Sequence, residues 1–179
     1  MRVFGLDGSD IRMARIYISL GSNIEPTRYL KAGLLSLREY FGPLQLSSMY
    51  ESEAVGFNGT NFLNMVVCAQ TSLNIAEVVA QFKQIEQNHG RLVGAKKFSP
   101  RTLDIDLLLY DDVVCQTPVV LPRAEIVSNA FVLWPLAEIA PNLIHPLQLK
   151  TYAAMWDEYD KTSQKLWPVA FEWPFGLTF

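Results

Sequence analysis

The sequence contains only two cysteines and two histidines among its 179 residues. Cys68 and Cys115 both stand in apolar surroundings and lack the spacing of metal ligands. A chain of this length can bury enough apolar surface to fold without a disulfide. We therefore expect both cysteines to be buried free thiols.

Long apolar runs and an excess of positive charge are also missing. No stretch approaches the roughly twenty apolar residues of a membrane helix. The N-terminus lacks a positive region followed by an apolar core and a cleavage site. The 15 basic and 18 acidic residues give a net charge of -3, which provides no general attraction for nucleic acid. We expect a soluble cytoplasmic protein without a membrane or nucleic-acid partner.

The length and the apolar half of the composition favour one domain with a substantial core. We expect this domain over residues 15–150. It follows an extension over residues 1–14 that lacks the hydrophobic periodicity of a helix or a strand. Met13 directly precedes the first convincing strand, so it is a candidate for the authentic start. The aromatic tail over residues 151–179 reads as a cover packed on the same domain. A monomer is expected, with a dimer formed through the tail as the alternative.

Hydrophobic periodicity predicts the order strand, helix, strand, strand, helix, strand. This is the order of a ferredoxin-like α+β fold, in which an antiparallel sheet carries both helices on one face. Further elements would follow at the C-terminus. The expected elements are a strand over 16–20 ended by a turn at 21–23, a helix from Pro26 to Gly42, strands over 44–52 and 62–71, a helix from Ile75 to about Gly90, and a strand from Asp104 to Tyr110.

A connection over residues 53–60 joins the two middle strands. It is longer than a hairpin needs, and loops carried on a rigid sheet often bind ligands. A plain surface loop explains the same residues equally well.

The segment FSPRTLDIDLLLY, residues 98–110, is the most informative in the chain. Alternate side chains of a strand leave the same face, so Asp104 and Asp106 would project together while Ile105 and Leu107 enter the other side. Two like charges at the start of a buried strand repel each other and lose hydration. Magnesium would compensate both, because it favours carboxylate oxygens, water and phosphates as ligands.

Basic residues stand directly before this pair. Lys96, Lys97 and Arg101 would meet the phosphate oxygens that a metal leaves free, so the segment favours phosphoryl-type transfer. An Asp-x-Asp triplet alone is a weak signal, since it also occurs in turns, helix caps and calcium loops. Its place at the start of an apolar strand strengthens the metal interpretation.

Several motifs together resemble the 6-hydroxymethyl-7,8-dihydropterin pyrophosphokinase family. The similarity extends from about Ile16 to His145, and PRTLDIDLLLY is its most specific part. The matching segments are ISLGSN at 18–23, FLN at 62–64, IEQNHGR at 85–91, PRTLDIDLLLY at 100–110 and FVLWPLAEIAPNLIHP at 131–146. The resemblance implies transfer of a pyrophosphoryl group from ATP to a pterin alcohol, with release of AMP.

The resemblance also implies roles in catalysis. Asp104 and Asp106 match the acids that hold two magnesium ions bridging the triphosphate. Arg91 and Arg101 match basic residues that act on the phosphates. No convincing general base is present, so positioning and charge stabilisation would carry the reaction.

The pterin site implied by the resemblance combines aromatic and polar groups. Phe62 and Phe131 would sandwich the ring, and Asn64 would pair with its edge, because an amide offers both a donor and an acceptor. The segment from Ser52 through Glu53 to Val55 matches a loop that contacts the pterin. Without the resemblance, both phenylalanines read as core residues.

The nucleotide side is assigned to Glu86, Lys97, Phe98, Ile105, Leu107 and Arg123. Here the chain departs from the usual pattern. Arg123 replaces a histidine, Asn129 replaces an arginine, and Pro118 and Val120 stand where polar contacts are usual. Guanidinium differs from imidazole in geometry and titration. These departures motivate one alternative, a non-catalytic binder of pterin or nucleotide. A different metal-dependent nucleotidyl or glycosyl transferase is the other.

Overall fold

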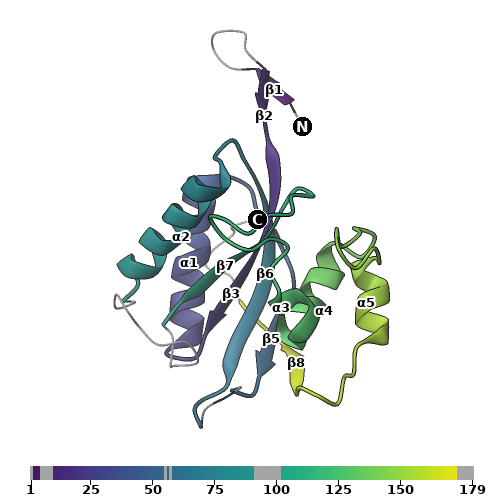
Figure 1. Cartoon of the computed structure of the whole chain (residues 1–179). Coiled ribbons are helices and arrows are strands. Elements are labelled where there is room, and N and C mark those ends of the chain that lie inside the picture. The colour runs from purple at the N-terminus through teal and green to yellow at the C-terminus, as the bar shows by residue number, and fades with distance from the viewer. Residues whose placement is uncertain (1, 5–9, 55, 57, 91–101, 173–179) are drawn as a thin grey trace.

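The computed structural model of the chain describes residues 2–4, 10–54, 56, 58–90 and 102–172 (Figure 1). Its main feature is a six-stranded antiparallel sheet, in the order β7-β3-β6-β5-β8, with β4 paired to β6. The antiparallel sheet predicted from the sequence is therefore confirmed. The first half of the chain supplies β3 (Ala14–Ser22), α1 (Pro26–Phe41), β4 (Gln45–Leu46), β5 (Met49–Ser52), β6 (Phe62–Thr71), α2 (Ile75–Asn88) and β7 (Asp104–Tyr110).

Two predicted boundaries were wrong. The first strand does not end before Gly21, because β3 continues through Ser22 and pairs with both β6 and β7 at this end. The predicted strand over 44–52 is divided into β4 and β5. Between them Ser47 leaves the ladder and forms its own contacts with Val66 of β6. Long-range strand pairing thus overrides the local turn signal of Gly21 and Ser22.

The ends of the two long helices follow local sequence signals. Pro26 lies in the first turn of α1, where its missing N–H costs nothing. Gly42 ends the helix with a φ of 74°, a backbone conformation that favours glycine. At α2, Asn74 accepts from the backbone N–H of Glu77, and the Glu77 carboxylate accepts from the N–H of Asn74. This capping box fixes where α2 begins.

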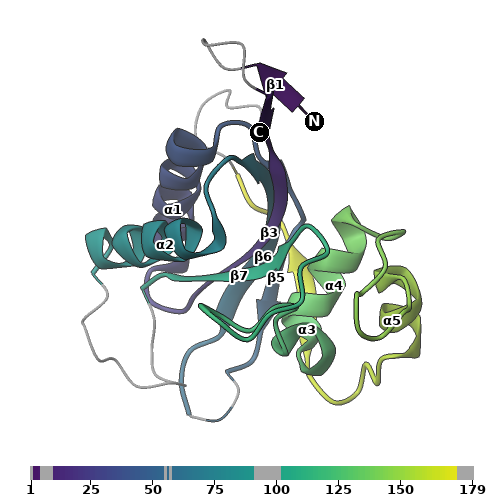
Figure 2. The ribbon, with the colours of Figure 1, turned by 45° about the horizontal axis from the view of Figure 1, so that its top comes forward.

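Each face of the sheet carries its own core layer. Ile16, Ile18 and Leu20 of β3 pack with α1 and α2, whereas Tyr17 packs on the other face. That second face is covered by α3 (Glu125–Ser128), α4 (Ala130–Ile139) and α5 (Tyr152–Glu158). Figures 1 and 2 show α1 and α2 side by side on one face and these three helices on the other. The sheet is therefore the middle layer of three.

A β-bulge in β7 adjusts which side chains face each layer. Tyr17 pairs with Leu109 and Ile18 pairs with Leu107, so Leu108 is the extra residue. Leu107 packs with α1 and α2, while Leu108 and Leu109 both pack on the second face. The bulge supports the second layer with two leucines and leaves the Leu108 carbonyl to accept from the backbone N–H of Arg123 at 3.0 Å.

The C-terminal part of the chain completes the sheet. β8 (Leu166–Val169) pairs antiparallel with β5 and places Trp167 opposite Glu51. The Trp167 indole donates to that carboxylate at 3.3 Å. Pairing of this kind covers the exposed edge of β5.

Both cysteines are free, as predicted. Cys68 is buried, but Cys115 is only half-buried, so that part of the prediction was wrong. Cys115 lies beside a turn and donates to the carbonyl of Val119 at 3.3 Å. Among the described residues, none of the helices has the length and hydrophobicity needed to cross a membrane.

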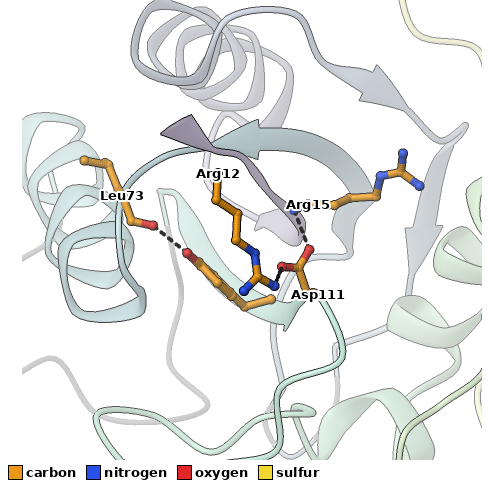
Figure 3. Close-up of polar contacts among 5 residues, drawn as sticks. Arg12, Arg15, Leu73 and Asp111 are labelled. Atoms are coloured by element: carbon orange, nitrogen blue, oxygen red, sulfur yellow. Dashed lines mark hydrogen bonds and ion pairs between the residues drawn. The ribbon is translucent and has the colours of Figure 1, made fainter. Parts of the chain in front are cut away.

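The N-terminal extension forms a two-stranded ladder, β1 (Arg2–Phe4) with β2 (Asp10–Arg12). Arg12 pairs with Asp111 at 3.2 Å, and the Asp111 carboxylate also accepts from the backbone N–H of Arg15 at 2.8 Å. Figure 3 shows that the Arg15 side chain points away from Asp111. These contacts fix the start of β3 against the turn after β7.

Candidate active site

The carboxylates of Asp104 and Asp106 lie at the start of β7. Asp104 pairs with Gly21 and Asp106 pairs with Ser19 across the β3–β7 ladder. Both leave the sheet on one face, because the intervening Ile105 and the following Leu107 pack with α1 and α2. Both carboxylate side chains remain partly exposed, that of Asp106 to 34%. This placement lets the pair share a cation with a bound ligand.

Arg123 reaches this pair from the segment before α3. Its Nη2 lies 3.0 Å from Asp106 Oδ1, and its Nε lies 3.3 Å from Glu125 Oε2. The main chain of Arg123 is fixed by its backbone bond to Leu108. The guanidinium is thus held between Glu125 and the predicted metal ligand Asp106.

Ile105 and Leu107 are only 3% and 2% exposed, so a nucleotide cannot contact their side chains. Their assignment as nucleotide-binding residues can apply only to their main chain. Among the described residues, β7 lies at one edge of the sheet, and an edge strand has backbone groups that do not pair within the ladder. One of these groups, the N–H of Ile105, already donates to Glu86.

Glu86 is buried in the end of α2, and its carboxylate accepts from the backbone N–H of Ile105 at 3.3 Å. It therefore ties α2 to the strand that carries Asp104 and Asp106. A role for Glu86 in nucleotide binding stays a prediction, whereas its contact with β7 is plain in the structure.

A polar pair is buried where β3, β6 and β5 meet. Asn64 donates from Nδ2 to Ser52 Oγ at 2.8 Å, and both side chains are buried. Gly21 pairs with Asn64 on one side and Asp104 on the other. A Cβ at Gly21 would lie 3.2 Å from Asn64 Oδ1. The glycine therefore provides the space for the amide.

Tyr50 lies directly opposite Asn64 in the β5–β6 ladder. Its hydroxyl donates to Glu138 Oε2 at 2.6 Å, and its ring packs on Trp134 of α4 with centroids 4.7 Å apart. Burial, reinforced by the Glu138 carboxylate, raises the pKa of Tyr50. The phenol therefore stays a neutral donor that fastens α4 to the sheet.

The two predicted aromatic residues are half-buried. Phe62 begins β6, and its ring edge lies 3.9 Å from the position of a Cβ at Gly21. Phe131 lies in the first turn of α4 and packs against the second core layer. Partial exposure of both rings is compatible with contact to a flat ligand.

The loop after β5 is tied to the rest of the structure near both ends. The backbone N–H of Glu53 donates to the Lys165 carbonyl at 3.3 Å, and the Glu53 carboxylate lies 3.6 Å from Lys165 Nζ. At the other end, Thr60 Oγ1 donates to the carbonyl of Asn23 at 2.7 Å. Sequence reasoning missed Asn23, whose buried side-chain amide also donates to the Thr60 carbonyl at 3.5 Å.

Several predicted site residues lie outside the described part of the chain. They are Val55 on the pterin side, and Arg91, Lys97, Phe98 and Arg101 on the phosphate side. Their roles stay predictions.

The described residues fit a magnesium site in which the substrate supplies some of the ligands. They contain no group of three or more His, Cys, Asp or Glu side chains arranged to hold a metal. Magnesium does not require one, because it is commonly held by one or two carboxylates together with water and substrate phosphates. Asp104 and Asp106 supply such a pair.

Comparisons with known proteins decide the family. Residues 17–141 match the family described as "7,8-dihydro-6-hydroxymethylpterin-pyrophosphokinase (HPPK)". The chain belongs to this family. It is 40% identical to the 2-amino-4-hydroxy-6-hydroxymethyldihydropteridine pyrophosphokinase of Aquifex aeolicus, over 77% of this chain and 88% of the relative. The enzyme of the same name from Bacillus subtilis is 38% identical, over 71% and 78% of the two chains.

Solved structures of HPPK domains share the fold. The chain superposes on Plasmodium falciparum HPPK-DHPS with pterin and p-hydroxybenzoate, with a TM-score of 0.69 at 13% identity. The match covers 85% of this chain and 44% of that longer one. At this identity the likeness shows the fold alone.

Membership of the HPPK family identifies the reaction that the chain catalyses. The chain is an ATP-dependent pyrophosphokinase, which transfers pyrophosphate from ATP to 6-hydroxymethyl-7,8-dihydropterin in folate biosynthesis. Nothing in the comparisons supports the alternative of a binder without turnover.

Proposed function

We propose that the Asp104 and Asp106 carboxylates hold the magnesium ions on which this HPPK reaction depends. The observation that carries the proposal is their shared face at the start of the edge strand β7, with partial exposure and a guanidinium nearby. Magnesium, when bound, would neutralise the triphosphate and make its β-phosphorus a better electrophile. The carboxylates themselves would serve as anchors that fix where the triphosphate lies.

Basic side chains would neutralise the negative charge that remains on the phosphates. We assign this task to Arg91, Lys97 and Arg101, together with Arg123, because guanidinium and ammonium groups stabilise charge on a transferring phosphoryl group. Phe98 and Glu86 are assigned to the nucleotide side as well, with contacts from the Ile105 and Leu107 main chain.

The pterin would be recognised by the polar pair and the two half-buried rings. Asn64 and Ser52 offer amide and hydroxyl groups, and their mutual bond holds the amide in one orientation before substrate arrives. Phe62 and Phe131 would stack on the ring faces, while Glu53 and Val55 belong to the adjoining loop. Such preorganisation places the hydroxymethyl oxygen for in-line attack, with no general base assigned.

The element order supports a ferredoxin-like core. Strands β3, β5, β6 and β7 stand in the sheet order β7-β3-β6-β5, which places the last strand of the motif beside the first. We assign residues 15–150 to the pyrophosphokinase domain, with 151–179 as a tail that packs on it through β8. We infer a cytoplasmic monomer with ATP and pterin as its small-molecule partners.

Product identification tests the function directly. The purified chain is incubated with ATP, magnesium and 6-hydroxymethyl-7,8-dihydropterin, and the products are identified by mass. The expected products are the pterin diphosphate and AMP in equal amounts. Formation of ADP and a pterin monophosphate would contradict pyrophosphoryl transfer. Binding of both substrates without AMP would favour the non-catalytic binder, and consumption of another nucleotide donor without pterin binding would favour a different transferase.

A further inference from the structure

We propose that Arg123 is an exchangeable counter-ion of Asp106: it occupies the carboxylate in the free enzyme and releases it more readily when metal arrives together with nucleotide than when metal arrives alone. This inference rests on the proposed metal role of Asp106. It gives the chain a way to disfavour bare divalent metal while accepting the metal–nucleotide complex.

The geometry places the guanidinium in direct competition with a cation. Arg123 Nη2 lies 3.0 Å from Asp106 Oδ1, so that oxygen already accepts from a positive donor. A metal ion on the same oxygen would lie close to the guanidinium, so the two positive charges would disfavour each other there. The backbone bond from Arg123 to Leu108 holds the competitor within reach after it is displaced.

Glu125 makes the exchange reversible. Its Oε2 lies 3.3 Å from Arg123 Nε, so the guanidinium keeps one carboxylate partner when Asp106 is taken away. The three side chains are each exposed by roughly a third, at 27% for Arg123, 34% for Asp106 and 35% for Glu125. A partly exposed pair of this kind is weak enough to break, because its attraction is screened by solvent.

Nucleotide supplies what bare metal lacks. A guanidinium that loses a carboxylate needs another anion, and phosphate oxygens match its forked donors. When metal and triphosphate enter together, Asp106 exchanges a guanidinium for metal and Arg123 exchanges a carboxylate for phosphate. Bare metal offers only the first half of this exchange, so Arg123 is left with Glu125 and solvent in place of a phosphate.

The decisive measurement is metal binding without nucleotide. Free Mn²⁺, which shares the octahedral oxygen preference of magnesium, is titrated into the intact chain and followed by electron paramagnetic resonance. Arg123→Gln is expected to tighten Mn²⁺ binding about two- to fivefold, as loss of a partly exposed competing pair implies. Glu125→Gln is expected to weaken it, because the guanidinium then depends more on Asp106.

Arg12→Gln is the matched control. Arg12 forms an ion pair with Asp111 at 3.2 Å at the opposite end of β3, so the substitution changes the net charge equally without touching Asp106. The proposal requires Arg123→Gln to exceed this control. Equal Mn²⁺ affinity in the two variants would overturn it.

A second ligand separates exchange from a merely structural role. Adenosine 5′-(α,β-methylene)triphosphate with magnesium cannot be cleaved at the bond that the reaction breaks, so its binding is measured by calorimetry. Arg123→Gln should weaken this complex while it tightens free Mn²⁺. If both ligands weaken, Arg123 only supports the fold and the proposal fails. Arg123→Met, which also removes the charge, provides the same comparison should the glutamine variant not fold.

Mn²⁺ titration of Asp106→Asn keeps the two proposals separate. Unchanged Mn²⁺ affinity in this variant would refute the proposed metal role of Asp106. Weaker Mn²⁺ binding in Asp106→Asn, without tighter binding in Arg123→Gln, would refute the exchange alone.

Discussion

Gly21 lies between Asn64 and Asp104 in adjacent strands of the sheet, so a single residue without a side chain separates the proposed pterin ligand from a proposed metal ligand. The position of a Cβ at Gly21 is 3.2 Å from Asn64 Oδ1, a tighter approach than such atoms normally make. Asn64 is in turn bonded to Ser52. Any side chain at Gly21 must therefore disturb the amide.

Substitution of Gly21 by alanine should affect the pterin more than the nucleotide. The added methyl group displaces Asn64 by a few tenths of an ångström, and we expect the KM for the pterin to rise about tenfold. Loss of one well-placed polar contact, worth about 1.4 kcal/mol, gives this factor. Steady-state kinetics with each substrate varied in turn measures the effect. An equal rise in the KM for ATP would show that the disturbance is not confined to the pterin side.

Replacement of Asp104 or Asp106 by asparagine should nearly abolish transfer while the fold persists. Asparagine keeps the size of the side chain but removes the charge that a magnesium ion needs, so we expect kcat to fall about a thousandfold or more. The thermal midpoint should change little, because relief of the repulsion between two like charges offsets the loss of a partly exposed ion pair at Asp106. Wild-type turnover with magnesium by either variant would refute the metal assignment.

Much of this site could be read from the sequence because strand alternation is a local property. The period of two placed Asp104 and Asp106 on one face and buried Ile105 and Leu107 on the other, and the structure agrees. The bulge at Leu108 then breaks the alternation without moving the two acids, since it lies after them.

Other features depend on contacts between distant segments. Gly21 and Ser22 carry a turn signal, yet pairing with β6 and β7 keeps them in β3. Arg123 shows no sequence sign of its 3.0 Å contact with Asp106, because that contact requires the backbone bond to Leu108. The strand β8 contains Pro168 and forms where the edge of β5 needs a partner. Local patterns cannot report such pairings.

Two buried tyrosines should respond in opposite ways to loss of their hydroxyl groups. Tyr152 is fully buried, and its hydroxyl has no hydrogen-bond partner within the described part of the chain. Tyr152→Phe removes an unsatisfied polar atom and should leave stability unchanged or raise it by about 1 kcal/mol. Tyr50→Phe removes the bond to Glu138 and should cost about 1.5–3 kcal/mol. Urea unfolding of both variants gives the comparison, and a large loss in Tyr152→Phe would reveal a partner for its hydroxyl.

Stability should fall on mild acidification because His145 must stay neutral. Its ring is buried, and burial lowers the pKa of His145 below the ordinary value of 6.5. Nδ1 accepts from the backbone N–H groups of Leu147 and Gln148, both at 3.1 Å, so a proton there would displace two donors. The unfolded chain takes up this proton near pH 6.5 and the folded chain only at lower pH. The stability contribution is therefore complete above pH 6.5 and is lost as the pH falls through the folded pKa.

Substitution of His145 by asparagine isolates this contribution. Its Oδ1 can accept in place of Nδ1 but does not titrate, so the variant should lose less stability than the wild type between pH 7.5 and pH 5.5. Two backbone contacts worth about 1 kcal/mol each set the size of the difference. His89→Gln measures the share of the other histidine, because burial lowers the pKa of His89 too while its ring contacts Ser36 at 3.2 Å in a different part of the fold. Urea unfolding at both pH values measures each slope. An unchanged slope in His145→Asn would assign the acid sensitivity to other groups.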